Sequence, residues 1–136
     1  MSRKNDTMNN MIEKQDNRVW IYCRVAHPDD LALTFQKEQM IKHAEKQGWE
    51  IVGITAEQES GTDFNRKGLK EVMEAVKAER VDIVLTKSIN RIGRDIYKTM
   101  ECVEWMNHYG VKLITADNGK VNFKPANDII GFMMIV

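Results

Sequence analysis

Apolar and polar positions alternate along this chain with two different periods, which predict strands and helices in turn. Short runs of apolar, often β-branched residues predict strands at 19–25, 50–55, 81–86 and 111–115. Between these runs, apolar residues return every three or four positions, as in helices packed on a sheet. The clearest helical stripe consists of Leu69, Val72, Met73 and Val76.

Residues suited to helix ends bracket the predicted helices. Asp29 and Asp30 can cap the first helix, which would end at Gly48, because a carboxylate accepts from free backbone N–H groups and glycine tolerates a left-handed end. Asn65 can cap the second helix, and the third follows Asp95. Each helix therefore fills the interval between consecutive strands.

This alternation predicts an α/β fold. We expect a three-layer sandwich with a mostly parallel four- to five-stranded sheet flanked by helices. Residues 18–124 would form the domain. Residues 1–17 are polar and aperiodic, which indicates a disordered leader or a cloning remnant. Residues 125–136 open an apolar helix that stops in mid-pattern, so we expect a helix that is cut short or needs a partner.

Composition narrows the function classes. The 136 residues include 20 Lys and Arg against 20 Asp and Glu, so the net charge of zero argues against a protein that coats DNA by bulk charge. Cys23 and Cys102 show no disulfide or zinc spacing, which favours reduced core thiols in a cytoplasmic protein. No apolar run approaches the ~20 residues of a membrane span. We expect no metal, because the histidines lack ligand spacing, and no nucleotide cofactor, because no glycine-rich phosphate loop is present.

Four arginines stand where predicted strands or their following loops end: Arg24, Arg66, Arg91 and Arg94. In a parallel sheet the carboxyl ends of the strands meet at one rim, where ligands collect. Guanidinium groups match phosphate oxygens with paired donors. The sequence therefore predicts a site for an anion with several oxygens, most simply a phosphodiester. Ordinary surface arginines at helix ends are the alternative.

Further polar residues fall near the same rim. Tyr22 and Ala26 share a strand face with Arg24, because side chains alternate along a strand. His27 is either a general base or a solvent-facing loop residue. Gln36 either bonds near the site or is a polar edge residue. Glu57 and Ser60 lie in the second loop, where a Ser-Gly pair is usually turn chemistry.

These residues resemble the catalytic domain of the serine recombinases, the resolvase/invertase family, from about residue 19 to the chain end. The matching motifs are Tyr22-Cys23-Arg24-Val25, Glu57-Gln58-Glu59-Ser60-Gly61, Asn65-Arg66-Lys67-Gly68-Leu69 and Asn90-Arg91-Ile92-Gly93-Arg94-Asp95. They occur in the family's order and on the expected elements.

The resemblance implies an enzyme that cuts and rejoins DNA without metal or cofactor. A serine hydroxyl attacks the phosphodiester, becomes joined to the 5′ phosphate and releases a 3′ hydroxyl. Arginines matching Arg24, Arg66, Arg91 and Arg94 hold that phosphate, and Gln36 and Ser60 match supporting positions. The partners implied are DNA and further copies in a homodimer or tetramer, with residues 125–136 as the start of the dimerisation helix.

The chain departs from the family pattern at the nucleophile. Where the family has Arg-Val-Ser, this chain has Arg24-Val25-Ala26, and Asn90 replaces the usual aspartate. A methyl group cannot attack phosphorus, so the domain as it stands is expected to be inactive. Either Ala26 was introduced deliberately or the site drifted naturally, and Asn90 and the altered turn favour drift.

Three functions remain open on this basis. The chain is an active or engineered-inactive recombinase domain, a non-catalytic relative that binds DNA or another recombinase subunit and regulates it, or a small-ligand or nucleotide-binding α/β domain. The missing glycine-rich loop disfavours the last.

Overall fold

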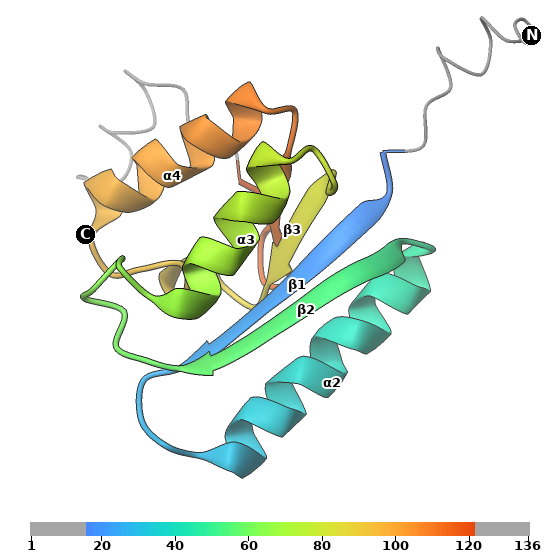
Figure 1. The fold of residues 1–136 in the computed structure, drawn as a ribbon. Helices are drawn as coiled ribbons and strands as arrows, with labels where there is room; N and C mark the ends of the chain where they lie inside the picture. The colour runs from blue at the N-terminus through green and yellow to red at the C-terminus, as the bar shows by residue number, and fades with distance from the viewer. Residues whose placement is uncertain (1–15, 122–136) are drawn as a thin grey trace, which may run out of the picture.

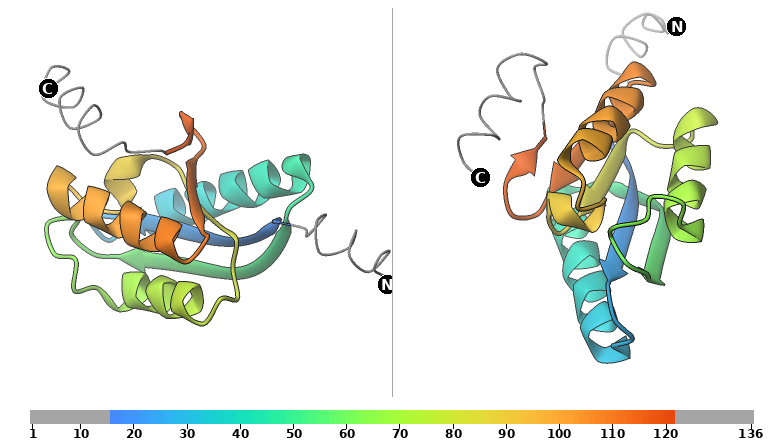
Figure 2. Two further views of the ribbon diagram at one scale, coloured as in Figure 1. Left: turned by 90° about the horizontal axis from the view of Figure 1, so that it is seen from above. Right: turned by 90° about the vertical axis from the view of Figure 1, so that its left-hand side faces the viewer.

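The computed structural model describes residues 16–121, which form one five-stranded sheet with helices on both faces (Figures 1 and 2). The elements, in chain order, are β1 (Arg18–Val25), α2 (Asp30–Gln47), β2 (Glu50–Gln58), α3 (Lys67–Lys77), β3 (Ile83–Thr86), the 3-10 turn η1 (Ile89–Arg91), α4 (Ile96–His108), β4 (Lys112–Thr115) and β5 (Gly119–Lys120). Most of the predicted leader and all of the predicted C-terminal helix lie outside the described residues.

The sheet has the strand order β2-β1-β3-β4-β5. Strands β1 to β4 pair in parallel, and β5 adds an antiparallel edge to β4. The predicted three-layer α/β fold is therefore confirmed. The chain leaves β1 toward β2 on one side and later returns to β3 on the other, so the switch in direction lies between β1 and β3. Ligand sites in such sheets form outside the carboxyl ends of the strands at this switch.

Each face of the sheet has its own apolar core, because successive residues of a strand point to opposite faces. Cys23 of β1 packs on the face covered by α2, together with Met40 and Ala44 of that helix. Tyr22, the preceding residue, packs on the opposite face with Val72 of α3 and the residues of α4. Figure 1 shows α2 on one side of the sheet and α3 and α4 on the other. Central β1 is thus buried on both sides.

Both predicted caps of α2 are confirmed, and α4 begins directly after Asp95 as expected. The Asp29 carboxylate accepts from the Ala32 N–H at 2.9 Å, and Gly48 ends α2 with a left-handed φ of 77°. Asp95 accepts from the first backbone N–H groups of α4.

The predicted cap of α3 is wrong. Arg66 occupies the N-cap position without a side-chain cap bond, and the Asn65 N–H itself donates to Asp63 at 2.8 Å. The helix finds its acceptor in a distant residue instead. Glu57 of β2 accepts from the Gly68 N–H at 2.8 Å. A carboxylate from a neighbouring strand thus replaces the local cap and joins the start of α3 to the end of β2.

Strand β2 is longer than predicted, because it continues through Glu57 to Gln58 instead of ending at Thr55. It pairs with β1 along its whole length, with a bulge opposite Val19 and Trp20. The extension carries Glu57 out of the expected loop and places it beside Tyr22.

Candidate anion-binding site

The site is built around Arg24, near the carboxyl end of β1. Its guanidinium is buried, with 3% of the residue exposed. The Nε donates to the Arg91 carbonyl at 2.8 Å, Nη1 to the Glu59 carbonyl at 2.9 Å and Nη2 to the Asn90 carbonyl at 2.7 Å. One side chain thereby ties the loop after β2 and the turn after β3 to the central strand.

Gln36 of α2 fixes the backbone of the same arginine. Its Oε1 accepts from the Arg24 N–H at 3.1 Å, and its Nε2 donates to the Arg24 carbonyl at 3.3 Å. Gln36 is buried, although it lies on a helix whose outer face is polar. The pairing of β3 with β1 ends at Ile21, so the Gln36 amide supplies Arg24 with the two backbone hydrogen bonds that a neighbouring strand would otherwise provide.

Arg66 forms a second buried cluster with Tyr22 and Glu57. Its Nη2 donates to the Tyr22 hydroxyl at 2.9 Å, and its Nε lies 3.4 Å from Glu57 Oε2. The Tyr22 hydroxyl in turn donates to Glu57. Burial, and then the hydrogen bond to Glu57, raise the pKa of Tyr22. Arg66 also donates to the Ile92 carbonyl at 2.6 Å, so this cluster holds the turn after β3 as well.

The four arginines share one electrostatic environment. The pKa of Arg24 is lowered, first by burial and then by the charge of Arg66, with further contributions from Arg91 and Arg94. Arg24 and Arg66 direct their donors to protein oxygens. Arg91 is half-buried, and its Nε is a buried donor without a partner among the described residues. Arg94 is exposed. The donors available to an incoming anion are therefore those of Arg91 and Arg94.

A close backbone approach makes room for Arg24. A Cβ atom added to Gly61 would lie 2.6 Å from Arg24 Nη2, so only glycine fits there without displacing the guanidinium. The Gly61 carbonyl also accepts from the Arg94 N–H at 3.0 Å. The Ser-Gly pair of the sequence thus brings the β2 loop against the arginine cluster.

The remaining predicted residues lie around this rim. Ala26 and His27 are exposed in the turn between β1 and α2. Ser60 is exposed, and its hydroxyl lies 2.9 Å from that of Thr62. Asn90 is exposed, and its Oδ1 accepts from the Ser88 hydroxyl at 2.6 Å. At position 26 the side chain is a methyl group, which can neither donate a proton nor attack an electrophile.

Sequence reasoning missed the acceptors that organise the arginines. They are backbone carbonyls of Glu59, Asn90, Arg91 and Ile92, which have no sequence signature. The cluster of Arg66, Tyr22 and Glu57 had one weak signal in the sequence. Thr55 and Glu57 are polar residues two positions apart, a spacing that places both side chains on the same face of a strand. Within residues 16–121, no group of His, Cys, Asp and Glu side chains is arranged to hold a metal ion. No helix in the same range is long and apolar enough to cross a membrane.

The chain belongs to the resolvase family, because the family model for the resolvase N-terminal domain matches residues 19–136. A resolvase/recombinase of Pseudomonas putida is 33% identical over 66 residues, which are 48% of this chain and 35% of that protein. The matched stretch thus spans about a third of that relative's length.

Solved structures agree with this assignment. A resolvase family site-specific recombinase from Streptococcus pneumoniae superposes with a TM-score of 0.69 at 25% identity, over 88% of this chain and 84% of that chain. The N-terminal catalytic domain of TP901-1 integrase gives a TM-score of 0.72 at 18% identity, over 87% of this chain and 92% of that chain. The second similarity concerns the fold alone.

Proposed function

We propose that this domain binds a DNA phosphodiester and, in its present form, does not cut the strand. The proposed binding surface is the arginine rim, by which we mean Arg24, Arg66, Arg91 and Arg94 at the carboxyl ends of the strands. The observation that carries this proposal is the methyl group of Ala26, which is exposed beyond a buried arginine cluster typical of phosphate chemistry. Family membership and the position of the cluster at the sheet's switch point support DNA as the partner.

The arginines divide into two roles in this proposal. Arg91 and Arg94 contact the phosphate, because the Arg91 Nε lacks a partner among the described residues and Arg94 faces solvent. A buried donor without an acceptor costs about 1–3 kcal/mol, which a phosphate oxygen would recover. Arg24 and Arg66 position the turn that carries both residues and add positive potential. Tyr22, Glu57 and Gln36 hold these two arginines in place.

Strand cleavage requires the hydroxyl that Ala26 lacks. In the family reaction a serine Oγ–P bond forms and the P–O3′ bond breaks, with the 3′ oxygen leaving as a hydroxyl. Two hydroxyls near the site within residues 16–121 have other partners: Ser60 shares a hydrogen bond with Thr62, and Tyr22 is buried and donates to Glu57. The proposed domain therefore holds the scissile linkage without forming the covalent intermediate.

The test is to restore the hydroxyl. We expect Ala26→Ser, in the full-length chain with supercoiled plasmid carrying its native flanking DNA, to give a protein–DNA adduct that survives denaturing electrophoresis. The parent protein should give none. Ala26→Ser combined with Arg91→Ala is the matched control and should also give none. If Ala26→Ser yields no adduct on any flanking sequence, the proposed chemistry is wrong.

A non-catalytic relative that regulates a recombinase is the second candidate. It is favoured by Ala26 together with Asn90, whose amide is bonded to Ser88 instead of presenting a carboxylate to the site. This candidate predicts that Ala26→Ser stays inactive while DNA binding keeps the salt dependence of the parent protein. Assembly into dimers or tetramers and a cytoplasmic location, where DNA is accessible, belong to both versions.

A further inference from the structure

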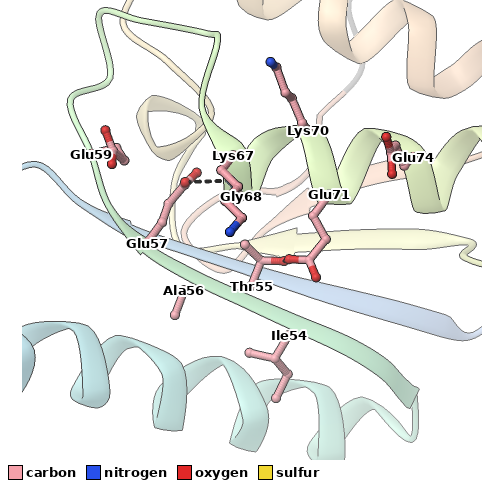
Figure 3. Close-up of a pocket in the computed structure, with 10 residues that line it drawn as sticks. All are labelled: Ile54, Thr55, Ala56, Glu57, Glu59, Lys67, Gly68, Lys70, Glu71 and Glu74. Carbon is pink, nitrogen blue, oxygen red and sulfur yellow. Dashed lines mark hydrogen bonds between the residues drawn. The ribbon is translucent and has the colours of Figure 1, made fainter.

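Strand β2 forms one edge of the sheet. It follows β1 in the strand order, and within residues 16–121 no other strand pairs with its outer side. A groove of about 650 Å³ runs between this edge and α3 and is lined by the strand residues Ile54, Thr55, Ala56 and Glu57 (Figure 3). Because α3 does not cover the edge, the backbone of β2 is open to another chain.

The outward backbone groups of β2 follow from its pairing with β1. The Glu59 N–H donates to the Val25 carbonyl of β1 at 3.0 Å. Since backbone groups alternate in direction along a strand, Glu57 and Thr55 also direct their N–H groups toward β1. The N–H groups of Gln58, Ala56 and Ile54 therefore point outward. Ile54 is central in this outward row.

Apart from the bulge at Val52, the edge has few of the features that usually prevent strands from pairing between molecules. Residues 50–58 contain no lysine or proline. Val52 and Ile54 are 36% and 38% exposed, on a strand of nine residues. A long apolar edge of this kind is a template for another strand unless a partner covers it.

We propose that β2 pairs antiparallel with β2 of a second copy of this chain, about a two-fold axis through Ile54. In this register Ile54 lies opposite its own copy and Val52 lies opposite Ala56. Apolar residues meet apolar residues, and no like charges are opposed. Because the backbone groups of Ile54 point outward, the two copies exchange hydrogen bonds at the axis.

The charges of α3 fit the same axis. Thr55 donates to Glu71 at 2.7 Å, which places Glu71 beside the centre of the edge. Lys67 and Lys70 precede this point along the helix, and Glu74 follows it (Figure 3). A two-fold rotation reverses the helix, so Lys67 faces the Glu74 of the second copy and Lys70 faces its Glu71. Opposite charges therefore face each other across the proposed contact between the two copies.

The groove is a poor site for DNA. Its lining has more acidic than basic side chains: Glu57, Glu59, Glu71 and Glu74 against Lys67 and Lys70. A phosphate backbone would be repelled there, whereas a second copy offers Glu74 and Glu71 as partners for Lys67 and Lys70. The contact is independent of the arginine rim and of any proposed DNA binding.

Disulfide trapping of the full chain tests the register. Paired strands bring opposite Cα atoms to about 5.5 Å, within disulfide range. We expect Ile54→Cys to form a disulfide-linked dimer under mild oxidation. Val52→Cys alone should stay monomeric on a non-reducing gel, because its counterpart is Ala56, but should cross-link when mixed with Ala56→Cys. The parent protein is the control for its own thiols, Cys23 and Cys102.

Sedimentation of the full chain tests the energetics. Ile54→Lys opposes two charges at the axis, and we expect its dimer to be roughly tenfold weaker than that of the parent. Lys67→Glu should weaken the dimer, and Lys67→Glu with Glu74→Lys should restore it. Circular dichroism confirms that each variant is folded.

Three results would overturn the proposal. One is a parent chain that stays monomeric at the highest concentration it tolerates. Another is a dimer that survives Ile54→Lys without an Ile54→Cys disulfide, which would place the contact elsewhere or assign β2 to a different protein. The third is a Val52→Cys homodimer, which would exclude this register.

Discussion

At the scale of single residues, two of the four arginines in the family motifs are buried and have little surface available to a ligand. Arg24 and Arg66 are 3% and 2% exposed. Their donors are directed to backbone carbonyls and to the Tyr22 hydroxyl. A guanidinium can bridge several acceptors at once because its N–H groups form a rigid planar fork. These side chains therefore shape the rim that Arg91 and Arg94 present.

This bridging role predicts that Arg24→Lys is not conservative. A lysine keeps the charge but cannot reach three carbonyls on two separate loops, so buried acceptors lose their donors. We expect the free energy of unfolding to fall by about 2–3 kcal/mol. Urea denaturation measures this change, with Arg94→Lys as the exposed control, expected within about 0.5 kcal/mol of the parent. Equal stability of both variants would refute the bridging role.

The buried thiols predict how stability changes at alkaline pH. Burial raises the pKa of Cys23 and of Cys102 to about 12. An unfolded thiol ionises near pH 8.5, so the unfolded chain loses its protons first and each thiol's contribution disappears between about pH 8.5 and 12. Below that window the contribution is fully present. The expected slope is about 1.4 kcal/mol per pH unit for each thiol.

Replacement of one thiol measures its contribution to the pH dependence of the free energy of unfolding. Cys23→Ala should make the fall in unfolding free energy above pH 9 shallower by about 1.4 kcal/mol per pH unit. Guanidinium titrations at several pH values measure this slope. Tyr22, whose pKa is also raised, contributes in the same direction and remains in both proteins. Parallel pH profiles for the two proteins would contradict the assignment.

At the scale of elements, the junction between β2 and α3 depends on Gly68. Its N–H donates to Glu57, and a Cβ atom there would lie 2.5 Å from Glu57 Cδ and 2.7 Å from Thr55 Cγ2. Glycine is a poor helix former, yet here it lets the strand carboxylate reach the helix end. The same carboxylate accepts from Tyr22 and lies beside Arg66, so the junction connects helix, strand and site.

Gly68→Ala tests that junction. Helix propensity alone predicts a gain of about 1 kcal/mol. The clash with Glu57 and Thr55 predicts instead a loss of about 1–3 kcal/mol, because the carboxylate must move away from Tyr22 and Arg66. Thermal or urea unfolding decides between the two signs. Lys77→Ala, an exposed change near the end of the same helix, is the control. A more stable Gly68→Ala protein would show that the junction is loose.

The features predicted correctly from sequence are those set by local chemistry. Asp29, Gly48 and Asp95 act on neighbouring residues, so their capping roles could be recognised directly. Features set by distant contacts could not. Glu57 caps a helix eleven residues away, and its polar character suggested a loop where β2 in fact continues. The two-residue strand β5 is too short to show a period.

The site follows the same division. Arginine positions are visible in a sequence, and their convergence follows from parallel strands ending at one rim. Which arginine faces solvent was not predictable, because Arg24 is satisfied by carbonyls that every residue possesses.

At the scale of the whole molecule, function depends on where charge lies and not on its sum. The net charge is zero. Four arginines nevertheless gather at the switch point between β1 and β3, whereas the groove along β2 has four glutamates against two lysines. Positive and negative side chains are thus concentrated in different parts of the molecule. DNA binding should therefore depend on very few cations.

That separation predicts a shallow but residue-specific salt dependence of DNA binding. The logarithm of affinity should fall with the logarithm of salt concentration by about 0.9 for each phosphate neutralised. Arg94→Ala in the full chain should reduce this slope by about 1 and weaken binding to all sequences alike, because a phosphate contact carries no base information. Lys77→Ala, an exposed change at the far end of α3, should leave the slope unchanged. Fluorescence anisotropy across a salt series measures both. If the two variants have the same slope as the parent, the arginine rim does not face the DNA backbone.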